Sequence, residues 1–205
     1  MSTPRIWSKE VHTPAGLIVV QGPVPSTLLE TMTMDQGLTA FRPPHKQIQA
    51  LIEISRLENG RIIIASLGET IIGYVTFHPP DEFERWAMGP KETLELGAIE
   101  VAPPFRNYKI GKTLLEVAFM DPSMEKHLII VTEYFWHWDL EGLGLHVWEY
   151  RDLMQRLMAH VGMVVKDTDD EEICAHPANI LMVRYGRDLS PEAIETFEKI
   201  LFLNS

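Results

Sequence analysis

The hydrophobic period of the chain changes between Leu94 and Phe119, and this change constrains the fold more than any other feature. The first residues of this stretch alternate between apolar and other side chains, as a β-strand does. From Ile110 the apolar residues recur three and four positions apart, as on the buried face of a helix. Pro103 and Pro104 lie between the two patterns and cannot continue a ladder of backbone hydrogen bonds. The stretch therefore predicts a strand, a turn and a helix.

The turn between this strand and this helix is basic, because Arg106, Lys109 and Lys112 lie in it or beside it. The first turn of a helix leaves backbone N–H groups without partners and carries partial positive charge. Such a turn is suited to hold a phosphate or a pyrophosphate group. The candidate binding residues are Arg106, Asn107, Tyr108, Lys109, Ile110, Gly111, Lys112 and Thr113.

Further strands and helices alternate along the rest of the chain. Apolar runs predict strands at 16–21, 61–66, 71–77, 127–134, 163–166 and 180–185. Helical spacing predicts one helix around Leu51, one around Met154 and one after Ser190, which can cap it. An α/β fold with about seven strands and a C-terminal helix accounts for this order. We expect residues 1–15 to form a loose N-terminal arm and residues 16–205 to form a single domain.

Charge and composition exclude several classes of function. The net charge is −11 at pH 7, which argues against nonspecific binding to nucleic acid. With Cys174 as its one cysteine, the chain can form neither an intrachain disulfide nor a cysteine-based zinc site. The first residues lack the apolar core of a signal peptide, and no apolar run is long enough to cross a bilayer. We therefore expect a cytoplasmic protein that has no membrane partner.

The predicted strand, basic turn and helix resemble the acetyl-CoA signature of the GNAT N-acetyltransferases. In that family a strand leads into Arg/Gln-x-x-Gly-x-Gly/Ala, and the amides of this turn hold the pyrophosphate of coenzyme A. Arg106 and Gly111 match the outer positions, whereas Lys109 stands where the first glycine is usual. Because a side chain restricts φ, we expect the lysine to limit the geometry of the turn. Its charge near the phosphates could offset this restriction.

The resemblance implies a particular sheet and a particular cosubstrate. The sheet would be mixed but mostly antiparallel, splayed at its central strands and flanked by helices. Acetyl-CoA would be the cosubstrate, and no metal would be needed. Backbone amides near Ile99 and Val101 would meet the pantetheine arm and the thioester, and would supply a hydrogen-bond donor to the developing oxyanion.

Other blocks of the sequence resemble the acetoin-utilisation branch of the same family. They include Leu38–Pro44, Glu95–Pro103, Thr132–Tyr134, Trp136–Leu140 and His176–Asn179. This resemblance implies a protein acceptor, because such enzymes act on the active-site lysine of acetyl-CoA synthetase. The candidate acceptor-binding residues are Phe41, Arg42, Tyr134 and His137.

Two glutamates of the predicted central strand are candidates for the general base. A lysine ammonium has a pKa of about 10.4, so a base must remove its proton before the amine can attack near neutral pH. Glu95 lies six residues before Val101, which is the spacing of the general base in GNATs of the histone-acetyltransferase type. Glu100 is the second candidate, and a bulge near Gly97 would bring both glutamates to one face. Either residue could instead have a structural role or contact the substrate.

The general acid of many family members is missing, because Met158 stands where a tyrosine is usual. Tyr134, Tyr150 or His137 could replace it, or the thiolate could leave without a proton.

The segment Trp136–Leu140 favours a packed aromatic loop over a metal site. Two other functions stay open. One is acetylation of a small-molecule amine on the same fold, and the other is coenzyme A-dependent regulation without turnover.

Overall fold

The structure, a computed structural model, describes residues 5–203, which form two compact units. The first unit contains the residues up to His78 together with Gly97–Asp121. The second contains Pro79–Leu96 and the residues from Pro122 onward. Strand β6 (Thr93–Val101) begins in the second unit and ends in the first. The expectation of a single domain over residues 16–205 stays a prediction.

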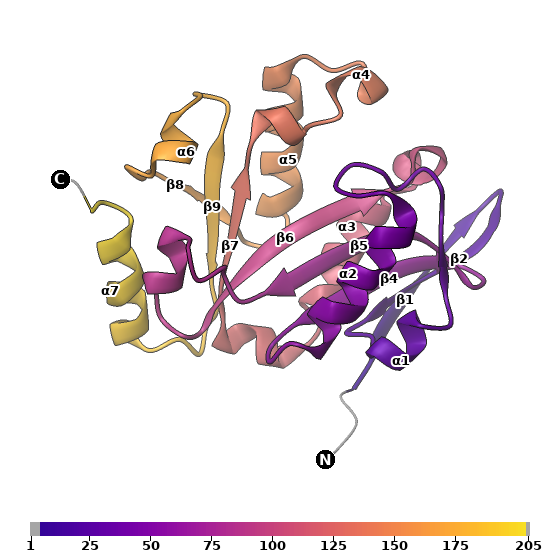
Figure 1. Ribbon diagram of the computed structural model, residues 1–205, viewed down its shortest axis with the longest axis horizontal. Helices are drawn as coiled ribbons and strands as arrows, with labels where there is room; N and C mark the ends of the chain where they lie inside the picture. The colour runs from indigo at the N-terminus through magenta and orange to yellow at the C-terminus, as the bar shows by residue number, and fades with distance from the viewer. Residues whose placement is uncertain (1–4, 204–205) are drawn as a thin grey trace. The chain divides into compact units, whose positions relative to one another are not determined.

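The first unit is built on antiparallel strands (Figure 1). In order across the sheet these are β1 (Trp7–Thr13), β2 (Gly16–Gly22), β4 (Arg61–Leu67) and β5 (Thr70–His78). The short strand β3 (Thr33–Met34) pairs in parallel with β5. The end of β6 also lies beside β5, where the amide of Ala102 donates to the carbonyl of Ile72 at 2.8 Å. β4 and β5 are buried along most of their length, which explains their largely apolar sequences.

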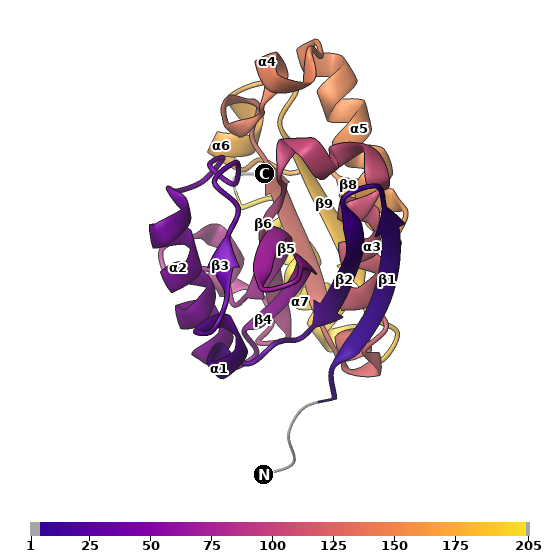
Figure 2. The same cartoon turned by 90° about the vertical axis from the view of Figure 1, so that its right-hand side faces the viewer.

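Helices cover both faces of these strands (Figure 2). α1 (Ser26–Leu29) and α2 (Pro44–Arg56) lie on one face, and α3 (Ile110–Ala118) lies on the other. The buried side chains of α3 are Ile110, Leu114, Leu115, Val117 and Ala118. These are apolar positions at helical spacing, so the helix predicted to begin at Ile110 is confirmed.

The second unit has a smaller set of strands. The start of β6 runs parallel to β7 (Leu128–Glu133), which pairs antiparallel with β9 (Ile180–Tyr185) and through it with β8 (Val164–Lys166). The β6–β7 ladder covers only Thr93–Glu95 against Leu128–Ile130, whereas β7 pairs with β9 along its whole length. β6 thus leaves its parallel neighbour after Glu95.

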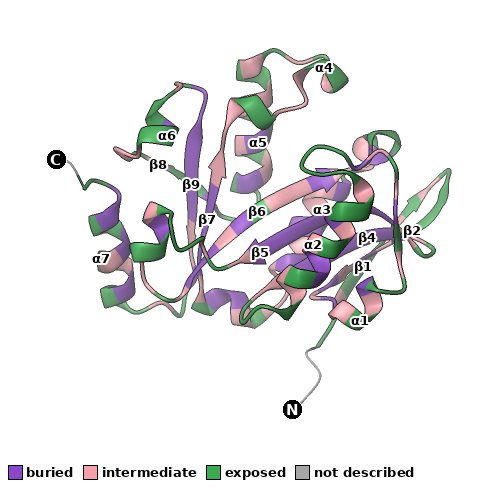
Figure 3. Cartoon of the chain, viewed as in Figure 1, coloured by how far each residue is buried: buried purple, intermediate pink, exposed green. Residues whose placement is uncertain are grey.

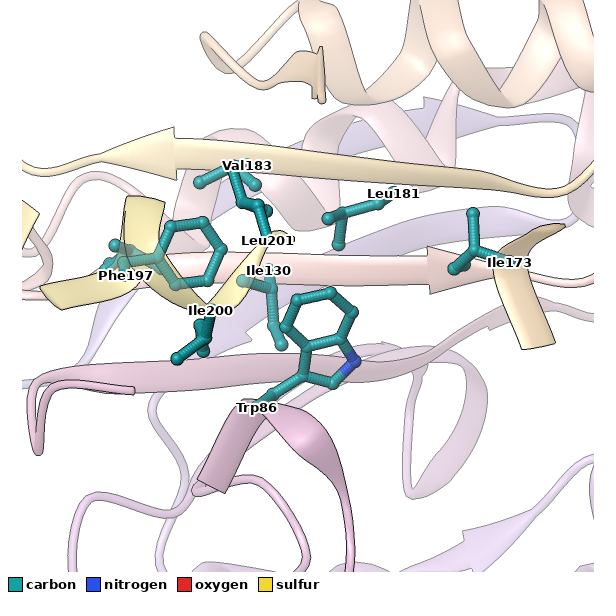
Figure 4. Packing of buried hydrophobic residues seen from close by; sticks show 9 residues of the cluster. Trp86, Ile130, Ile173, Leu181, Val183, Phe197, Ile200 and Leu201 are labelled. Carbon is teal, nitrogen blue, oxygen red and sulfur yellow. The ribbon is translucent and has the colours of Figure 1, made fainter. Parts of the chain in front are cut away.

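Short helices surround these strands. They are η1 (Arg85–Met88), η3 (Pro122–Lys126), η4 (Phe135–His137), α4 (Leu140–Leu143), α5 (Val147–Ala159), α6 (Glu171–Cys174) and α7 (Pro191–Ile200). The expected cap of α7 is present, because the Ser190 hydroxyl accepts from the amide of Ala193 at 3.1 Å. Trp86 packs near Phe197 in the core between these strands and α7, with ring centroids 6.1 Å apart (Figure 4). Figure 3 shows the same core as buried stretches along β7 and β9.

The predicted fold class is confirmed as a mixed, mostly antiparallel sheet flanked by helices, with a helix near the C-terminus. Within residues 5–203 the chain forms nine strands, two more than expected, because β1 and β3 were not predicted. No helix in that range combines the length and the apolar character that crossing a membrane requires.

The N-terminal segment differs from the loose arm expected at residues 1–15. Residues Trp7–Thr13 form β1 and pair with β2 throughout, from Trp7 opposite Gly22 to Thr13 opposite Gly16. Their sequence is mostly polar and their side chains are exposed or half-buried, as is usual for an edge strand, so it gave no apolar signal. Residues 1–4 lie outside the described part of the chain.

Candidate functional site

The basic turn forms as a 3-10 helix that passes directly into α3. This 3-10 helix, η2 (Pro103–Tyr108), and α3 meet at Lys109, which has φ 58° and ψ 26°. That is the left-handed conformation, in which a side chain is strained by roughly 1–2 kcal/mol. The lysine therefore adopts a backbone conformation that favours glycine. The restriction that a side chain was expected to place on φ therefore appears as backbone strain at Lys109.

Hydrogen bonds hold this turn to the strand before it and to the helix after it. Arg106 Nε donates to the carbonyl of Val101 at 3.1 Å, and the Thr113 hydroxyl donates to the carbonyl of Lys109 at 3.1 Å. The first amides of α3 follow Lys109, and a helix leaves such amides without intrahelical partners. Their number and their positive potential suit the pyrophosphate of a nucleotide cofactor.

The other side chains of the turn differ in how free they are. Lys109 and Asn107 are exposed, and Tyr108 and Gly111 are half-buried. Lys112 Nζ lies 3.9 Å from Glu116 Oε1, and the other oxygen of Glu116 pairs with Lys9 at 2.7 Å. Exposed pairs of this kind contribute little to stability and can exchange for a phosphate.

The strand end that leads into the turn carries Ile99 and Val101, both half-buried. The amide of Ala102 donates toward β5. Because successive amides of a strand point to opposite edges, the amide of Val101 points away from β5. This orientation suits the role expected for the Val101 amide.

Glu100 is buried in the first unit, with 6% of its surface exposed. Its Oε2 accepts from the Tyr74 hydroxyl at 2.7 Å, and its Oε1 accepts from the amide of Ala40 at 2.8 Å. Burial and the negative charge of Glu100 raise the pKa of Tyr74 above its usual range, and the charge of Arg42 acts in the opposite direction. Tyr74 thus stays a neutral donor to this carboxylate.

Glu95 lies in the second unit and is half-buried. Its side chain hydrogen-bonds to that of Glu84 in the loop before η1, and Asp81 is also near. Burial, then the charge and hydrogen bond of Glu84, then the charge of Asp81 raise the pKa of Glu95 to about 8. A carboxyl group with a pKa this close to neutral can exchange protons at physiological pH.

The loop that brings Glu84 to Glu95 is fixed by the first two residues of its short helix. Arg85 forms an ion pair with Asp169, and its Nε lies 3.5 Å from Asp170 Oδ2. Trp86, the next residue, is buried in the core. The acidic residues 169 and 170 therefore hold this arginine.

Between the two glutamates, Gly97 makes room for His78. A Cβ at Gly97 would lie 2.2 Å from His78 Nε2, which is shorter than any real contact of that kind. Both residues belong to the first unit. The glycine thus permits a close approach of an imidazole. The bulge expected at this position stays a prediction.

Aromatic rings pack along the loop after β7. Tyr134 stacks on Trp136 with centroids 4.8 Å apart, and Trp138 stacks on Tyr150 at 5.0 Å. His137 lies at the edge of Tyr134, 6.1 Å between centroids. These contacts agree with a packed aromatic loop. Among residues 5–203 no group of three His, Cys, Asp or Glu side chains is arranged to hold a metal ion.

A carboxylate that the sequence did not single out lies under this loop. Glu133, the last residue of β7, accepts a hydrogen bond from Trp138 Nε1 at 2.9 Å. Burial raises the pKa of Glu133 to about 7, although the bond from Trp138 acts in the opposite direction. The carboxyl group fixes the aromatic loop to the end of the strand.

The structure gathers the candidate residues in two places. Glu100, Phe41, Arg42 and the basic turn belong to the first unit, whereas Glu95, Tyr134 and His137 belong to the second. Sequence reasoning missed Glu84 as a partner of Glu95, and no local pattern could have found it, because only the fold brings the two carboxyl groups together. Met158, at the position of the usual general acid, is fully buried.

Comparison with known proteins identifies relatives of the chain. The pattern of the Acetyltransferase (GNAT) family matches residues 29–121. The acetoin utilization protein AcuA of Bacillus licheniformis is 52% identical over 198 residues, which cover 96% of this chain and 94% of that protein. AcuA of Bacillus subtilis is 49% identical over 196 residues, covering 95% of this chain and 93% of that protein.

A solved structure is also similar to this chain. The crystal structure of an acetoin utilization protein from Exiguobacterium sibiricum matches with a TM-score of 0.94 at 51% sequence identity. The match covers 98% of this chain and 96% of that one. Fold and sequence therefore agree over nearly the whole length of the chain.

Proposed function

Since this chain belongs to the GNAT acetyltransferase family and is an N-acetyltransferase that uses acetyl-CoA, we propose that its acceptor is a lysine side chain of a protein. The proposal is carried by identities of 49–52% to acetoin utilization proteins over nearly the whole chain. The acceptor would be acetyl-CoA synthetase. Acetylation of the active-site lysine of the synthetase would inactivate it. The enzyme would thereby switch off acetate activation in acetate and acetoin metabolism.

Acetyl-CoA would bind with its pyrophosphate at the turn formed by residues 106–113. The amides at the start of α3 would donate to the phosphate oxygens, and Arg106, Lys109 and Lys112 would balance their charge. Ile99 and Val101 would face the pantetheine arm and the thioester. The left-handed conformation of Lys109 supports this role, because it keeps the path that a glycine would give the turn.

Glu95 would act as the general base of a direct transfer in a ternary complex. The lysine nitrogen attacks the thioester carbonyl carbon, the carbon–sulfur bond breaks, and the proton of the amine passes to the Glu95–Glu84 pair. A pKa of about 8 supports this role, because a base is most effective when its pKa is near the working pH. Glu100, the second candidate, suits the role less well, since both of its oxygens already accept hydrogen bonds.

The departing thiolate would be protonated by one of three side chains, or it would leave without a proton. Tyr134, Tyr150 and His137 are the candidates, and the first two are held in aromatic stacks. Burial raises the pKa of Tyr134 above its usual range, so this phenol keeps its proton at neutral pH but is a weak acid toward a departing thiolate. Phe41, Arg42, Tyr134 and His137 would contact the acceptor protein.

The test is incubation of the enzyme with acetyl-CoA and purified acetyl-CoA synthetase. We expect release of free coenzyme A thiol, one acetylated active-site lysine in the synthetase by mass spectrometry, and a parallel loss of synthetase activity. The Glu95→Gln variant serves as the control for enzyme-dependent transfer. Thiol release with small amines but not with the synthetase would favour a metabolite acetyltransferase. Binding of coenzyme A without thiol release from any acceptor would favour a regulatory protein.

A further inference from the structure

A buried carboxylate fastens one segment of the first unit to β6. Glu100 accepts from the amide of Ala40 with one oxygen and from the hydroxyl of Tyr74 with the other. Tyr74 is fully buried in β5, and Glu100 is 6% exposed. Burying an ionised carboxylate is costly unless its oxygens accept hydrogen bonds. Each of these two bonds therefore fixes its donor, and one donor is the backbone of Ala40.

The fastened segment is Leu38–Arg42, which we call the acceptor segment. Leu38 is fully buried at its start. The turn before it closes when Asp35 Oδ1 accepts from the amide of Gly37 at 2.8 Å. Phe41 is 40% exposed and Arg42 is exposed. The segment is thus held by Leu38 and Ala40, and it presents the two side chains that follow.

The same stretch of β6 also holds the basic turn. Val101, the residue after Glu100, accepts from Arg106 Nε at 3.1 Å. The basic turn also lies close to the residue before the acceptor segment, because a Cβ at Gly37 would lie 2.9 Å from Pro103 Cδ. Neighbouring residues of one strand therefore position both the basic turn and the segment that carries Phe41 and Arg42.

We propose that Glu100 is a positioning residue that, together with Tyr74, holds the acceptor segment in the conformation in which Phe41 and Arg42 receive the acceptor. It does not take the proton of the amine. The inference rests on the proposed function only in treating Phe41 and Arg42 as acceptor contacts. Loss of the clamp formed by Glu100 and Tyr74 loosens the segment and weakens acceptor binding. It leaves the chemical step and the affinity for acetyl-CoA nearly unchanged.

The experiment compares Glu100→Ala, Glu100→Gln and Tyr74→Phe. Glutamine keeps an oxygen that can accept from Ala40, and its amide can donate to the Tyr74 oxygen, so this variant preserves the clamp. Tyr185→Phe is the matched control, because Tyr185 also donates to a glutamate, Glu198, but lies in the second unit. Two quantities are measured: hydrogen exchange at the amides of residues 38–42, and KM and kcat with acetyl-CoA synthetase as the acceptor.

We expect Glu100→Ala and Tyr74→Phe to speed exchange of the Ala40 amide and to raise the acceptor KM, each by at least about tenfold, the value of one charged hydrogen bond. Glu100→Gln and Tyr185→Phe should stay within about threefold of the wild type in both. Unchanged exchange at Ala40 in Glu100→Ala and Tyr74→Phe would overturn the inference. A rise of the KM for acetyl-CoA as large as that of the acceptor KM would overturn it too.

A loss of kcat of about 10²-fold or more in Glu100→Gln would also overturn it, because such a loss identifies a proton acceptor. If wild-type enzyme does not acetylate the synthetase, the proposed acceptor fails instead. The exchange measurement still decides whether the clamp holds the segment. Should Tyr74→Phe fail to fold, the contrast between Glu100→Ala and Glu100→Gln supplies the same comparison.

Discussion

The side chains of Glu84 and Glu95 hydrogen-bond to each other, which joins the loop before η1 to strand β6. Two carboxyl groups can form this bond only if one of them carries a proton, since carboxylates only accept. The pair therefore keeps one proton up to about pH 8, well above the ordinary value of 4.5. When the pair is fully ionised, it is a stronger base than an isolated glutamate.

Replacing Glu95 by glutamine tests this pair as the base. Glu95→Gln keeps the shape of the side chain and removes its basicity, so we expect kcat to fall by about 10²–10⁴. Affinity for acetyl-CoA, measured by calorimetry, should hardly change, because the carboxyl group acts on the acceptor. Raising the pH should restore part of the activity, since more of the acceptor is then free amine. Full activity of this variant at neutral pH would show that Glu95 is an ordinary strand residue.

The Glu84→Gln variant provides a finer test of the same pair. It removes the neighbouring charge, so the pKa of Glu95 should fall toward its ordinary value. The rise of kcat/KM with pH, measured from about pH 6 to 9, should then begin at a lower pH than in the wild type. An unchanged pH profile would separate Glu84 from the reaction.

The raised pKa values of Glu95 and Glu133 predict how stability depends on pH. A carboxyl group whose pKa is raised on folding binds its proton more tightly in the folded chain than in the unfolded chain. The resulting stabilisation is complete below about pH 4.5 and is lost as the pH rises through about 7 for Glu133 and about 8 for Glu95. Urea unfolding should therefore show the free energy of unfolding falling by at least about 1 kcal/mol from pH 5.5 to 8.5.

Single variants assign this loss to its sources. Glu95→Gln and Glu133→Gln should each flatten the decline, and Glu133→Gln should act over the lower part of the range. Glu198, whose pKa is lowered by Lys166 and Tyr185 despite opposing burial, makes an opposite contribution that is lost only as the solution becomes acidic. A decline that is the same in both variants and the wild type would show that neither carboxyl group is perturbed as described.

Elements with a strong local pattern were predictable, and contacts between distant segments were not. The helix at Ile110 and the cap of the last helix at Ser190 were predictable because each depends on neighbours within one turn. β1 was not, because an edge strand lacks the apolar alternation that identifies a buried one.

The candidate site shows the same division more sharply. Glu95 and Glu100 both stand out in the sequence as strand glutamates, yet their surroundings come from other segments. Glu84 reaches Glu95 from a loop, and Ala40 and Tyr74 reach Glu100 from elsewhere in the first unit. One glutamate is thereby left with a proton to exchange and the other with both oxygens occupied. Only the fold separates the two roles.

Gly111 offers a test of the pyrophosphate site that leaves the helix intact. It is the second residue of α3, where the helix dipole favours a negative charge. Gly111→Asp should therefore fold at least as well as the wild type. The same charge repels phosphate, and we expect calorimetry to detect no binding of acetyl-CoA. Gly111→Ala measures the effect of bulk without charge. Wild-type affinity in a folded Gly111→Asp variant would place the pyrophosphate elsewhere.

The strained backbone of Lys109 allows conformation and charge to be measured separately. In Lys109→Gly the left-handed conformation becomes free of strain, which is worth roughly 1–2 kcal/mol. The extra freedom of glycine in the unfolded chain offsets about 0.5–1 kcal/mol of this. We therefore expect thermal or urea unfolding to show a gain of up to about 1 kcal/mol. Asn59→Gly is the matched control, because Asn59 has φ 64° in the same unit but lies outside the basic turn.

The same lysine variants decide whether the side chain binds the cofactor. If its ammonium contacts a phosphate, Lys109→Gly and Lys109→Ala should both weaken the binding of acetyl-CoA by about 1.5–3 kcal/mol, the range for a charged hydrogen bond. Asn59→Gly should leave that affinity unchanged. A coenzyme A fragment without the pyrophosphate should lose less affinity on either Lys109 substitution, since the contact is then absent from the start. If Lys109→Gly binds acetyl-CoA more tightly than the wild type, the lysine is a tolerated replacement for the usual glycine and not a ligand.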